Sequence, residues 1–316
     1  MMDAMMVLGG LLLLLVGGEA LVRGSVTLAR HLGVSELLIG LTLVGAMTSA
    51  PELLVSLSAS WEDAPDMALG NVVGSNIANL LLISAAGALV RPLMVPRFVV
   101  LHDGVINAVA ALLVAALAVH GQIGRWPGAA LLLCLFWYLR RAYVLEKRRS
   151  RPSVHEREAR ELEQPALPRV LAVLAVLGGV LALVAGAAIL VKGGSAMARS
   201  FGVPEVVIGL SLLAVGTSLP ELATSMVAAW RGHTQVAVGN LFGSCIFNSL
   251  GITGAAAVLT PLPVAPELAS RDVWVMVAVS VALPVWMGVW GRVGRGGGGG
   301  LLVGYCTYLA WVFVQA

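Results

Sequence analysis

The chain is poor in charged residues, which make up only 12% of its 316 positions; soluble domains carry about 25%. Its mean hydropathy is +0.92. Apolar runs of about 20 residues recur along the whole length, as a bilayer core about 30 Å thick requires. The scarcity of charge excludes an ordinary soluble domain and indicates an all-α polytopic membrane protein.

Cysteine and histidine are also scarce. The three cysteines, Cys134, Cys245 and Cys306, are far apart and lack metal-ligand spacing. We therefore expect buried, inert thiols rather than disulfides or a zinc site. The N-terminal apolar run lacks a basic segment, since Asp3 is its only early charge, and it lacks a clear cleavage site. We interpret it as the first membrane helix rather than a signal peptide.

The apolar runs predict ten membrane spans, each about 17–25 residues long. Their expected limits are 5–22, 35–60, 70–90, 98–119, 127–145, 168–191, 204–229, 238–259, 272–290 and 300–315. The polar segment 146–167 is interpreted as a cytoplasmic linker between two five-helix halves, residues 1–145 and 168–316. The glycine run 296–300 is expected to be a flexible loop.

Basic residues are divided unevenly between alternate loops. With the N-terminus outside, the inside loops hold sixteen of the 20 Lys and Arg residues. Only Arg125, Lys192, Arg199 and Arg271 fall outside. Cytoplasmic loops carry such an excess, which predicts an N-out, C-out topology and accounts for the positive net charge without a nucleic acid partner. Low Lys with high Ala, Leu, Val and Arg indicates a bacterial protein of the plasma (inner) membrane.

An internal repeat relates the two halves of the chain. The segment GVSELLIGLTLVGAMTSAPELLVSLSASW from Gly33 aligns without a gap with GVPEVVIGLSLLAVGTSLPELATSMVAAW from Gly202. From Leu21 to Asn79, 27 of 59 aligned positions are identical. Five spans separate the copies, so the second is expected to be inverted in the membrane. Inverted repeats are typical of secondary transporters that bind substrate at the midplane.

Each copy carries two polar motifs in apolar surroundings. The first is Thr48-Ser49-Ala50-Pro51-Glu52, matched by Thr217-Ser218-Leu219-Pro220-Glu221. The second is Gly70-Asn71-x-x-Gly74-Ser75-Asn76-Ile77-Ala78-Asn79, matched by Gly239-Asn240-x-x-Gly243-Ser244-Cys245-Ile246-Phe247-Asn248. A carboxylate in mid-membrane costs roughly 2.5–3.5 kcal/mol on insertion scales. Glu52 and Glu221 are therefore expected to face each other or a wet cavity, and to bind cations.

The motifs predict a site for a hard cation. Pro51 and Pro220 each free a backbone carbonyl near the neighbouring Thr. Carboxylate, carbonyl, hydroxyl and amide oxygens suit Ca²⁺ better than Mg²⁺, and with neither His nor Cys among the ligands, Zn²⁺, Cu and Fe are disfavoured. One Ca²⁺, two Na⁺ or two H⁺ would each neutralise the two carboxylates, as antiport at a shared site requires. Alternatively, Asn76 and some of the other hydroxyl and amide side chains only join helices. Asp103, in the fourth span, is expected at the membrane interface.

The paired TS-x-PE and GN-x-x-GS-x-I-x-N motifs resemble the α-repeats of the cation/calcium antiporter superfamily, in particular sodium/calcium exchangers of the prokaryotic kind. The resemblance covers both halves. It implies that spans 2, 3, 7 and 8 form a tight core across which spans 1 and 6 slide. It also implies Ca²⁺ and Na⁺ binding by Glu52 and Glu221. The implied further ligands are the carbonyls of Thr48 and Thr217 for Ca²⁺; Ser49, Ser75, Ser218, Ser244 and the carbonyls of Gly45 and Ala214 for Na⁺; and Asn79 and Asn248 for the central site.

Two positions depart from the family pattern. Many exchangers carry Asp where this chain has Asn248, so the resemblance does not fix the ion stoichiometry or any K⁺ coupling. Met47 replaces the usual glycine before Thr-Ser, whereas Gly216 keeps it, and we expect local helix unwinding to differ at the first site.

The function expected from the sequence is secondary transport rather than enzyme catalysis. The chain would exchange Na⁺ for Ca²⁺ by alternating access and extrude Ca²⁺. It would do so as a monomer in the lipid bilayer, with both ions as substrates and no tightly bound cofactor. The alternatives are an H⁺-coupled antiporter of Ca²⁺ or other divalent cations, and a passive channel or non-transporting sensor.

Overall fold

The computed structural model describes residues 2–61, 65–149, 167–201 and 216–315, and nearly all of them are helical. The first half contains α1 (Met2–Leu32), α2 (Glu36–Ile39), α3 (Gly45–Thr48), α4 (Ala50–Trp61), α5 (Pro65–Ala78), α6 (Ser84–Val90), α7 (Arg97–Val99), α8 (Val105–Ala118) and α9 (Arg125–Arg149). Three π-helical turns lie between them: η1 (Gly40–Val44), η2 (Asn79–Ile83) and η3 (Val100–Gly104).

The second half repeats this order. It contains α11 (Arg169–Ser200), α14 (Leu219–Arg231), α15 (Thr234–Ile246), α16 (Thr253–Leu259), α17 (Val273–Trp290) and α18 (Arg295–Gln315). Its π-helical turns are η5 (Phe247–Ile252) and η6 (Leu268–Asp272). Most of the predicted linker (150–166) and the start of the seventh predicted span (202–215) lie outside the described residues.

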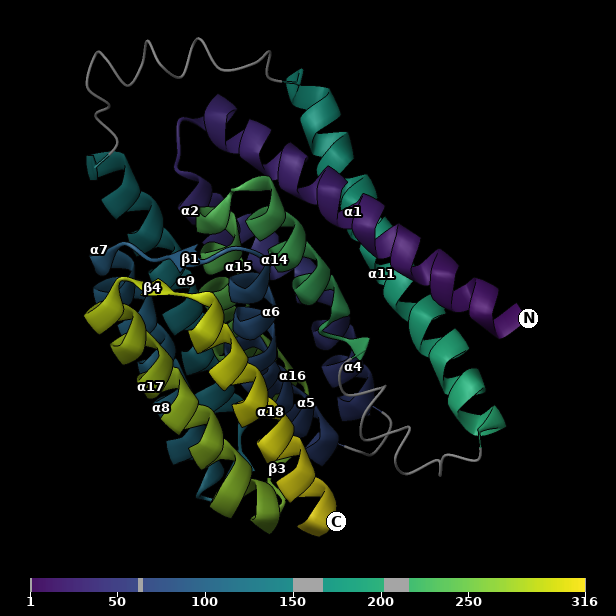
Figure 1. Cartoon of the computed structure of the whole chain (residues 1–316). Helices are drawn as coiled ribbons and strands as arrows, with labels where there is room; N and C mark the ends of the chain where they lie inside the picture. Colours follow the sequence, from purple (N-terminus) through teal and green to yellow (C-terminus); the bar gives the residue numbers. More distant parts are fainter. Residues whose placement is uncertain (1, 62–64, 150–166, 202–215, 316) are drawn as a thin grey trace.

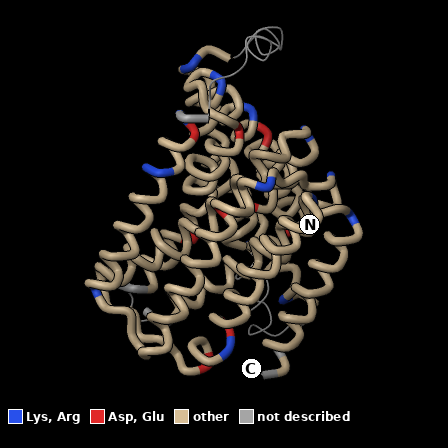
Figure 2. The backbone as a smooth tube through the Cα atoms, turned by 90° about the vertical axis from the view of Figure 1, so that its left-hand side faces the viewer, with Lys and Arg blue, Asp and Glu red and all other residues tan. Residues whose placement is uncertain are grey.

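Seven described helices are long and apolar enough to cross a membrane, and an eighth candidate is the bent pair Glu36–Thr48 and Ala50–Ala59. The helices α14 and α18 are not among these candidates. The residues shortly before α14, 202–215, lie outside the described part of the chain. The layout of ten spans therefore stays a prediction. Figure 2 shows Lys and Arg gathered toward the ends of the bundle and a few acidic residues near its middle.

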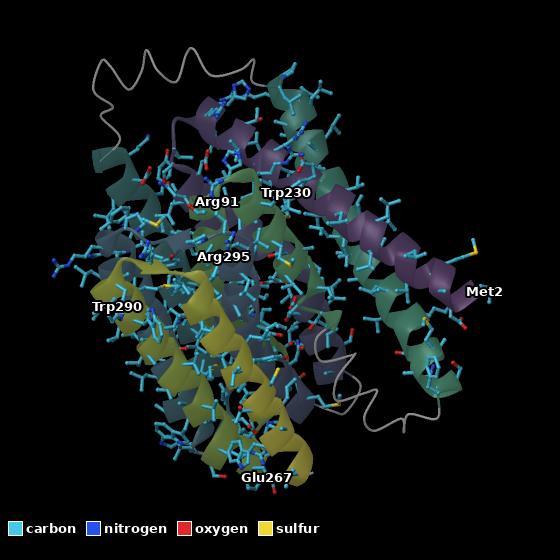
Figure 3. The ribbon with its side chains drawn as sticks, in the orientation of Figure 1. Met2, Arg91, Trp230, Glu267, Trp290 and Arg295 are labelled. Atoms are coloured by element: carbon cyan, nitrogen blue, oxygen red, sulfur yellow. The ribbon has the colours of Figure 1, made fainter. Side chains whose placement is uncertain are left out.

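Two small strand pairs mark opposite ends of the bundle (Figure 1). The strand β1 (Leu93–Met94) pairs antiparallel with β4 (Arg292–Val293), and β2 (Gln122–Ile123) pairs antiparallel with β3 (Leu262–Pro263). In the alignment of the two repeats, Leu93 of β1 corresponds to Leu262 of β3, so equivalent segments of the two halves lie at opposite ends. Figure 3 shows Arg91 and Arg295 near one end and Glu267 at the other.

The helices α1 and α11 are longer than the spans predicted at 5–22 and 168–191, with 31 and 32 residues. They lie side by side, run in opposite directions and slant across the rest of the bundle (Figure 1). A helix of this length spans about 45 Å at 1.5 Å per residue. Because that exceeds the bilayer core, such a helix tilts.

Regularly spaced glycines bring α1 and α11 into backbone contact. They are Gly10, Gly17 and Gly24 on α1, and Gly179, Gly186 and Gly193 on α11. A Cβ atom on Gly17 would lie 2.8 Å from the carbonyl oxygen of Gly179, and one on Gly179 would lie 2.8 Å from that of Gly17. The two helices therefore pack as one unit, as small residues allow in membranes.

Two expectations about local structure are wrong. The glycine run 296–300 is not a loop but the first turns of α18, because tertiary packing overrides the low helix propensity of glycine. A Cβ on Gly298 would lie 3.0 Å from the carbonyl oxygen of Ala85 on α6. Of the cysteines, only Cys245 is buried; Cys134 and Cys306 are exposed on the protein surface.

Candidate cation site

Both glutamates sit just after a break in a helix. The helix α3 ends at Thr48 and α4 begins at Ala50, with a bend of 41° between the two segments. The backbone angles at the break are φ −79°, ψ 7° for Ser49 and φ −86°, ψ 5° for Ser218. Met47 predicts that helix unwinding differs between the two sites. The backbone conformation at these two serines is nearly the same, so no such difference occurs there.

Each glutamate is bound by the other half of the protein. The Ser49 hydroxyl donates to Glu221 Oε1 at 2.9 Å, and the Ser218 hydroxyl donates to Glu52 Oε1 at 3.1 Å. The exposed fraction is 0% for Glu52 and 1% for Glu221. The two helix breaks thus face each other, and the carboxylates lie in the interior of the bundle.

The second oxygen of each carboxylate has no hydrogen-bond donor among the described residues. Glu52 Oε2 and Glu221 Oε2 are buried without a partner in the described part of the chain. No Lys, Arg or His among the described residues forms an ion pair with either glutamate. Because a buried charge is costly unless it is compensated, this arrangement favours a bound cation between the carboxylates.

The two central asparagines lie at π-helical turns. Asn79 is the first residue of η2 and Asn248 is the second of η5. The helix α4, which carries Glu52, contacts η5, and α14, which carries Glu221, contacts η2. Single π-helical turns inside α-helices are frequent at functional sites. The fold therefore packs the turn that carries each asparagine against the helix that carries the glutamate of the other half.

Several other predicted ligands carry buried polar atoms without partners. Within the described ranges, Ser75 Oγ, Thr217 Oγ1, Asn248 Oδ1 and both amide atoms of Asn79 lack a hydrogen bond. Native proteins leave few buried polar groups unsatisfied. A cluster of them on the motif residues, together with the free carboxylate oxygens, is what an ion-binding site requires.

Some of the remaining predicted ligands form hydrogen bonds with other residues of the protein. The Ser244 hydroxyl donates to the carbonyl of Gly45 at 3.4 Å, so the structure brings these two residues together. The Thr48 hydroxyl donates to Asn240 Oδ1 at 3.0 Å. The predicted cation ligand of Thr48 is its carbonyl oxygen, which this hydrogen bond does not use. Ala214 lies outside the described residues. The ligand roles of the carbonyls of Thr48, Thr217 and Gly45 stay predictions.

Asn71 and Asn240 are functional candidates that the sequence did not single out. The Asn71 amide donates to the carbonyl of Glu52 at 3.1 Å and to Ser56 Oγ at 3.0 Å. The Asn240 amide donates to the carbonyl of Glu221 at 3.4 Å and to Ser225 Oγ at 3.0 Å. The same two contacts occur at equivalent positions of both repeats, so each asparagine fixes the helix that carries a glutamate. Their identical place in the second motif was the available signal.

Replacing Asn240 with Leu is expected to destabilise the protein more than replacing Asn71. Asn240 is fully buried and also accepts the Thr48 hydroxyl, whereas Asn71 is only half-buried. Each lost hydrogen bond costs about 0.5–1.5 kcal/mol, and a buried group left unpaired costs more. Thermal unfolding of both variants in detergent measures the difference. Equal unfolding temperatures would contradict it.

Asp103 is buried within the bundle, and its expected place at the membrane interface stays a prediction. Its exposed fraction is 3%, and its Oδ1 accepts the Tyr138 hydroxyl at 3.1 Å. The equivalent Asp272 accepts the Tyr308 hydroxyl at 3.2 Å. Within the bundle, Tyr138 of α9 covers the carboxylate of Asp103. These two carboxylates have partners and lie outside the site described above.

A polytopic helical bundle with a buried pair of carboxylates between its halves fits a cation antiporter. The chain belongs to the sodium/calcium exchanger family, whose model, described as sodium/calcium exchanger protein, matches residues 3–144 and 171–314. As such, it is a multi-pass transporter of the plasma membrane.

Full-length relatives support this assignment. The chain is 34% identical over 312 residues to CaxA of Alkalimonas amylolytica, which is described as a putative antiporter, with 97% of each chain covered. It is 33% identical over 310 residues to the inner membrane protein YrbG of Escherichia coli (strain K12), covering 96% of this chain and 94% of that protein. A solved structure of the sodium-calcium exchanger NCX_Mj is similar with a TM-score of 0.84 and 28% identity, and 98% of both chains is covered.

Proposed function

We propose that this protein exchanges Na⁺ for Ca²⁺ across the plasma membrane by alternating access, and that it extrudes Ca²⁺. The observation that carries the proposal is the pair of buried carboxylates, each with one oxygen held by a serine of the opposite half and the other oxygen without a donor among the described residues. Two negative charges without a basic partner require compensation by cations.

The surrounding oxygens favour Ca²⁺ and Na⁺ as substrates. Ca²⁺ is bound by six to eight oxygen ligands in flexible geometry. Glu52, Glu221 and the amides of Asn79 and Asn248, with the carbonyls of Thr48 and Thr217, supply ligands of this kind. The proposed Na⁺ ligands are Ser49, Ser75, Ser218 and Ser244, with the carbonyls of Gly45 and Ala214. In the part of the chain that the structure describes, no group of three or more His, Cys, Asp and Glu residues is placed to hold a metal. Neutral oxygens must therefore complete the coordination.

Competition for one pair of charges provides the coupling. One Ca²⁺ neutralises the two carboxylates, and so do two Na⁺, so either ion species compensates the site while the other is absent. The proposed topology has ten spans in two inverted halves, N-out and C-out, acting as a monomer. It is supported by the equivalent strands β1 and β3 at opposite ends of the bundle. In such a fold the substrate site lies between the repeats near the midplane.

Uptake of ⁴⁵Ca²⁺ into Na⁺-loaded proteoliposomes tests the proposal. We expect uptake to require an outward Na⁺ gradient and to collapse when internal Na⁺ is replaced by choline. Two protons also neutralise the carboxylates, so the matched experiment replaces the Na⁺ gradient with a pH step. Uptake driven by the pH step alone would assign the protein to H⁺-coupled antiport instead. Uptake without either gradient would indicate a channel.

A further inference from the structure

Asn76 on α5 holds the amide of Asn248 in one orientation. Asn248 Nδ2 donates to Asn76 Oδ1 at 3.2 Å. Asn76 in turn donates its own Nδ2 to Ser249 Oγ at 2.8 Å and faces Met276 Sδ at 3.5 Å. All four residues are buried, with exposed fractions of 0% or 1%.

The direction of this chain of hydrogen bonds follows from its chemistry. An amide side chain carries an NH₂ group on one side and an acceptor oxygen on the other. A thioether sulfur accepts and never donates, so the side of Asn76 that faces Met276 is its NH₂. Its oxygen therefore faces Asn248. If Asn248 flipped, its Oδ1 would lie against Asn76 Oδ1, and two acceptors would meet without a hydrogen.

The amide oxygen of Asn248 is thereby left for another partner. Asn248 Oδ1 is buried and accepts no hydrogen bond from a described residue. An oxygen in this position suits a cation, whereas the NH₂ group would repel one. The turn η5 contacts the helix of Glu52, which favours assigning that oxygen to the carboxylate site proposed above.

The other central amide, Asn79, has only the Cys245 thiol as a neighbouring partner at the equivalent place among the described residues. In the alignment of the two repeats, the counterpart of Asn76 is Cys245, whose thiol is a weak donor and a weak acceptor. Asn79, the counterpart of Asn248, has neither amide atom in a hydrogen bond with the described residues. The repeat has thus diverged at the one position that orients the central amide.

We propose that Asn76 is a positioning residue that directs the Asn248 oxygen toward the transported cation, and so makes the two central amides unequal ligands. Asn248 is the fixed ligand, and Asn79 is the amide whose orientation the cation itself sets. The inference rests on the proposed function, because it assumes that Ca²⁺ binds between the two glutamates. It assigns Asn76 a role that helix packing alone does not explain.

Equilibrium ⁴⁵Ca²⁺ binding to the purified, detergent-solubilised protein tests the role of Asn76. Asn76→Cys introduces the residue that the second half carries at this position, and it removes the acceptor for Asn248. We expect the Kd for Ca²⁺ to rise about tenfold, since the freed amide turns its NH₂ group toward the cation in part of the molecules. Asn107→Cys is the matched control, because Asn107 is an equally buried asparagine on α8, and it should leave the Kd unchanged.

A second background separates positioning from simple structural support. In Asn248→Asp protein, either carboxylate oxygen serves as a ligand, so adding Asn76→Cys should change the Kd less than about twofold. A tenfold rise in both backgrounds, an equal rise for Asn107→Cys, or no rise at all would overturn the inference. Binding needs no gradient, so loss of Na⁺-driven uptake with intact Ca²⁺ binding would refute only the Na⁺-coupled function. Absence of Ca²⁺ binding by the wild type would overturn both.

Discussion

Replacing either Glu52 or Glu221 with Gln is expected to reduce Na⁺-driven ⁴⁵Ca²⁺ uptake at least about 100-fold. The substitution keeps the shape of the side chain and one oxygen but removes one of two charges. A divalent cation then leaves the site with an uncompensated charge in the bundle interior, which costs several kcal/mol. A cost of about 1.4 kcal/mol already corresponds to a factor of ten in affinity. The Gln variants retain an acceptor for Ser49 or Ser218, so folding should be preserved.

The control for this prediction is Glu267→Gln. Glu267 lies at one end of the bundle, exposed to solvent (Figure 3), so the same loss of charge should leave uptake within about twofold of wild type. Proteoliposomes prepared with equal amounts of each variant allow initial rates to be compared. Uptake that survives in both site variants would mean that the cation binds elsewhere in the chain.

That the two glutamate-bearing segments meet could be predicted from the sequence because two separate signals coincide there. The internal repeat places Glu52 and Glu221 at equivalent positions, and the cost of a carboxylate in an apolar span makes a structural role for both implausible. Which serine contacts which glutamate was not predictable from the motif. Each serine lies in the same motif as the glutamate of its own half, yet each donates to the opposite one, because the halves cross at their helix breaks.

Features that depend on packing between distant helices could not be predicted. Nothing near Asp103 in the sequence reveals that Tyr138 covers it. The start of α18 is helical and packs closely against α6, whereas its run of glycines by itself predicts a loop. The lengths of α1 and α11 were underestimated because hydropathy detects the apolar core of a helix, not the extensions that a tilted helix makes beyond it.

The glycine contacts between α1 and α11 lead to a second large effect. Gly10→Ala and Gly179→Ala are expected to destabilise the protein by about 1–3 kcal/mol each, the range for overpacking a tight interface. A Cβ on Gly10 would lie 2.8 Å from the carbonyl oxygen of Gly186, and one on Gly179 would lie 2.7 Å from the backbone nitrogen of Leu21. Backbone atoms cannot rotate away as a side chain does, so the helices must separate.

The neighbouring glycines supply matched controls one residue away. A Cβ on Gly9 or on Gly178 would meet no described atom within 4 Å. Gly9→Ala and Gly178→Ala should therefore be neutral or stabilise by up to about 1 kcal/mol, since alanine favours helix more than glycine does. Apparent unfolding temperatures in detergent distinguish the two pairs, at about 2–4 °C per kcal/mol for a chain of this size. If all four variants behaved alike, α1 and α11 would not pack through these glycines, and the prediction that the two helices slide across the core as one unit would lose its support.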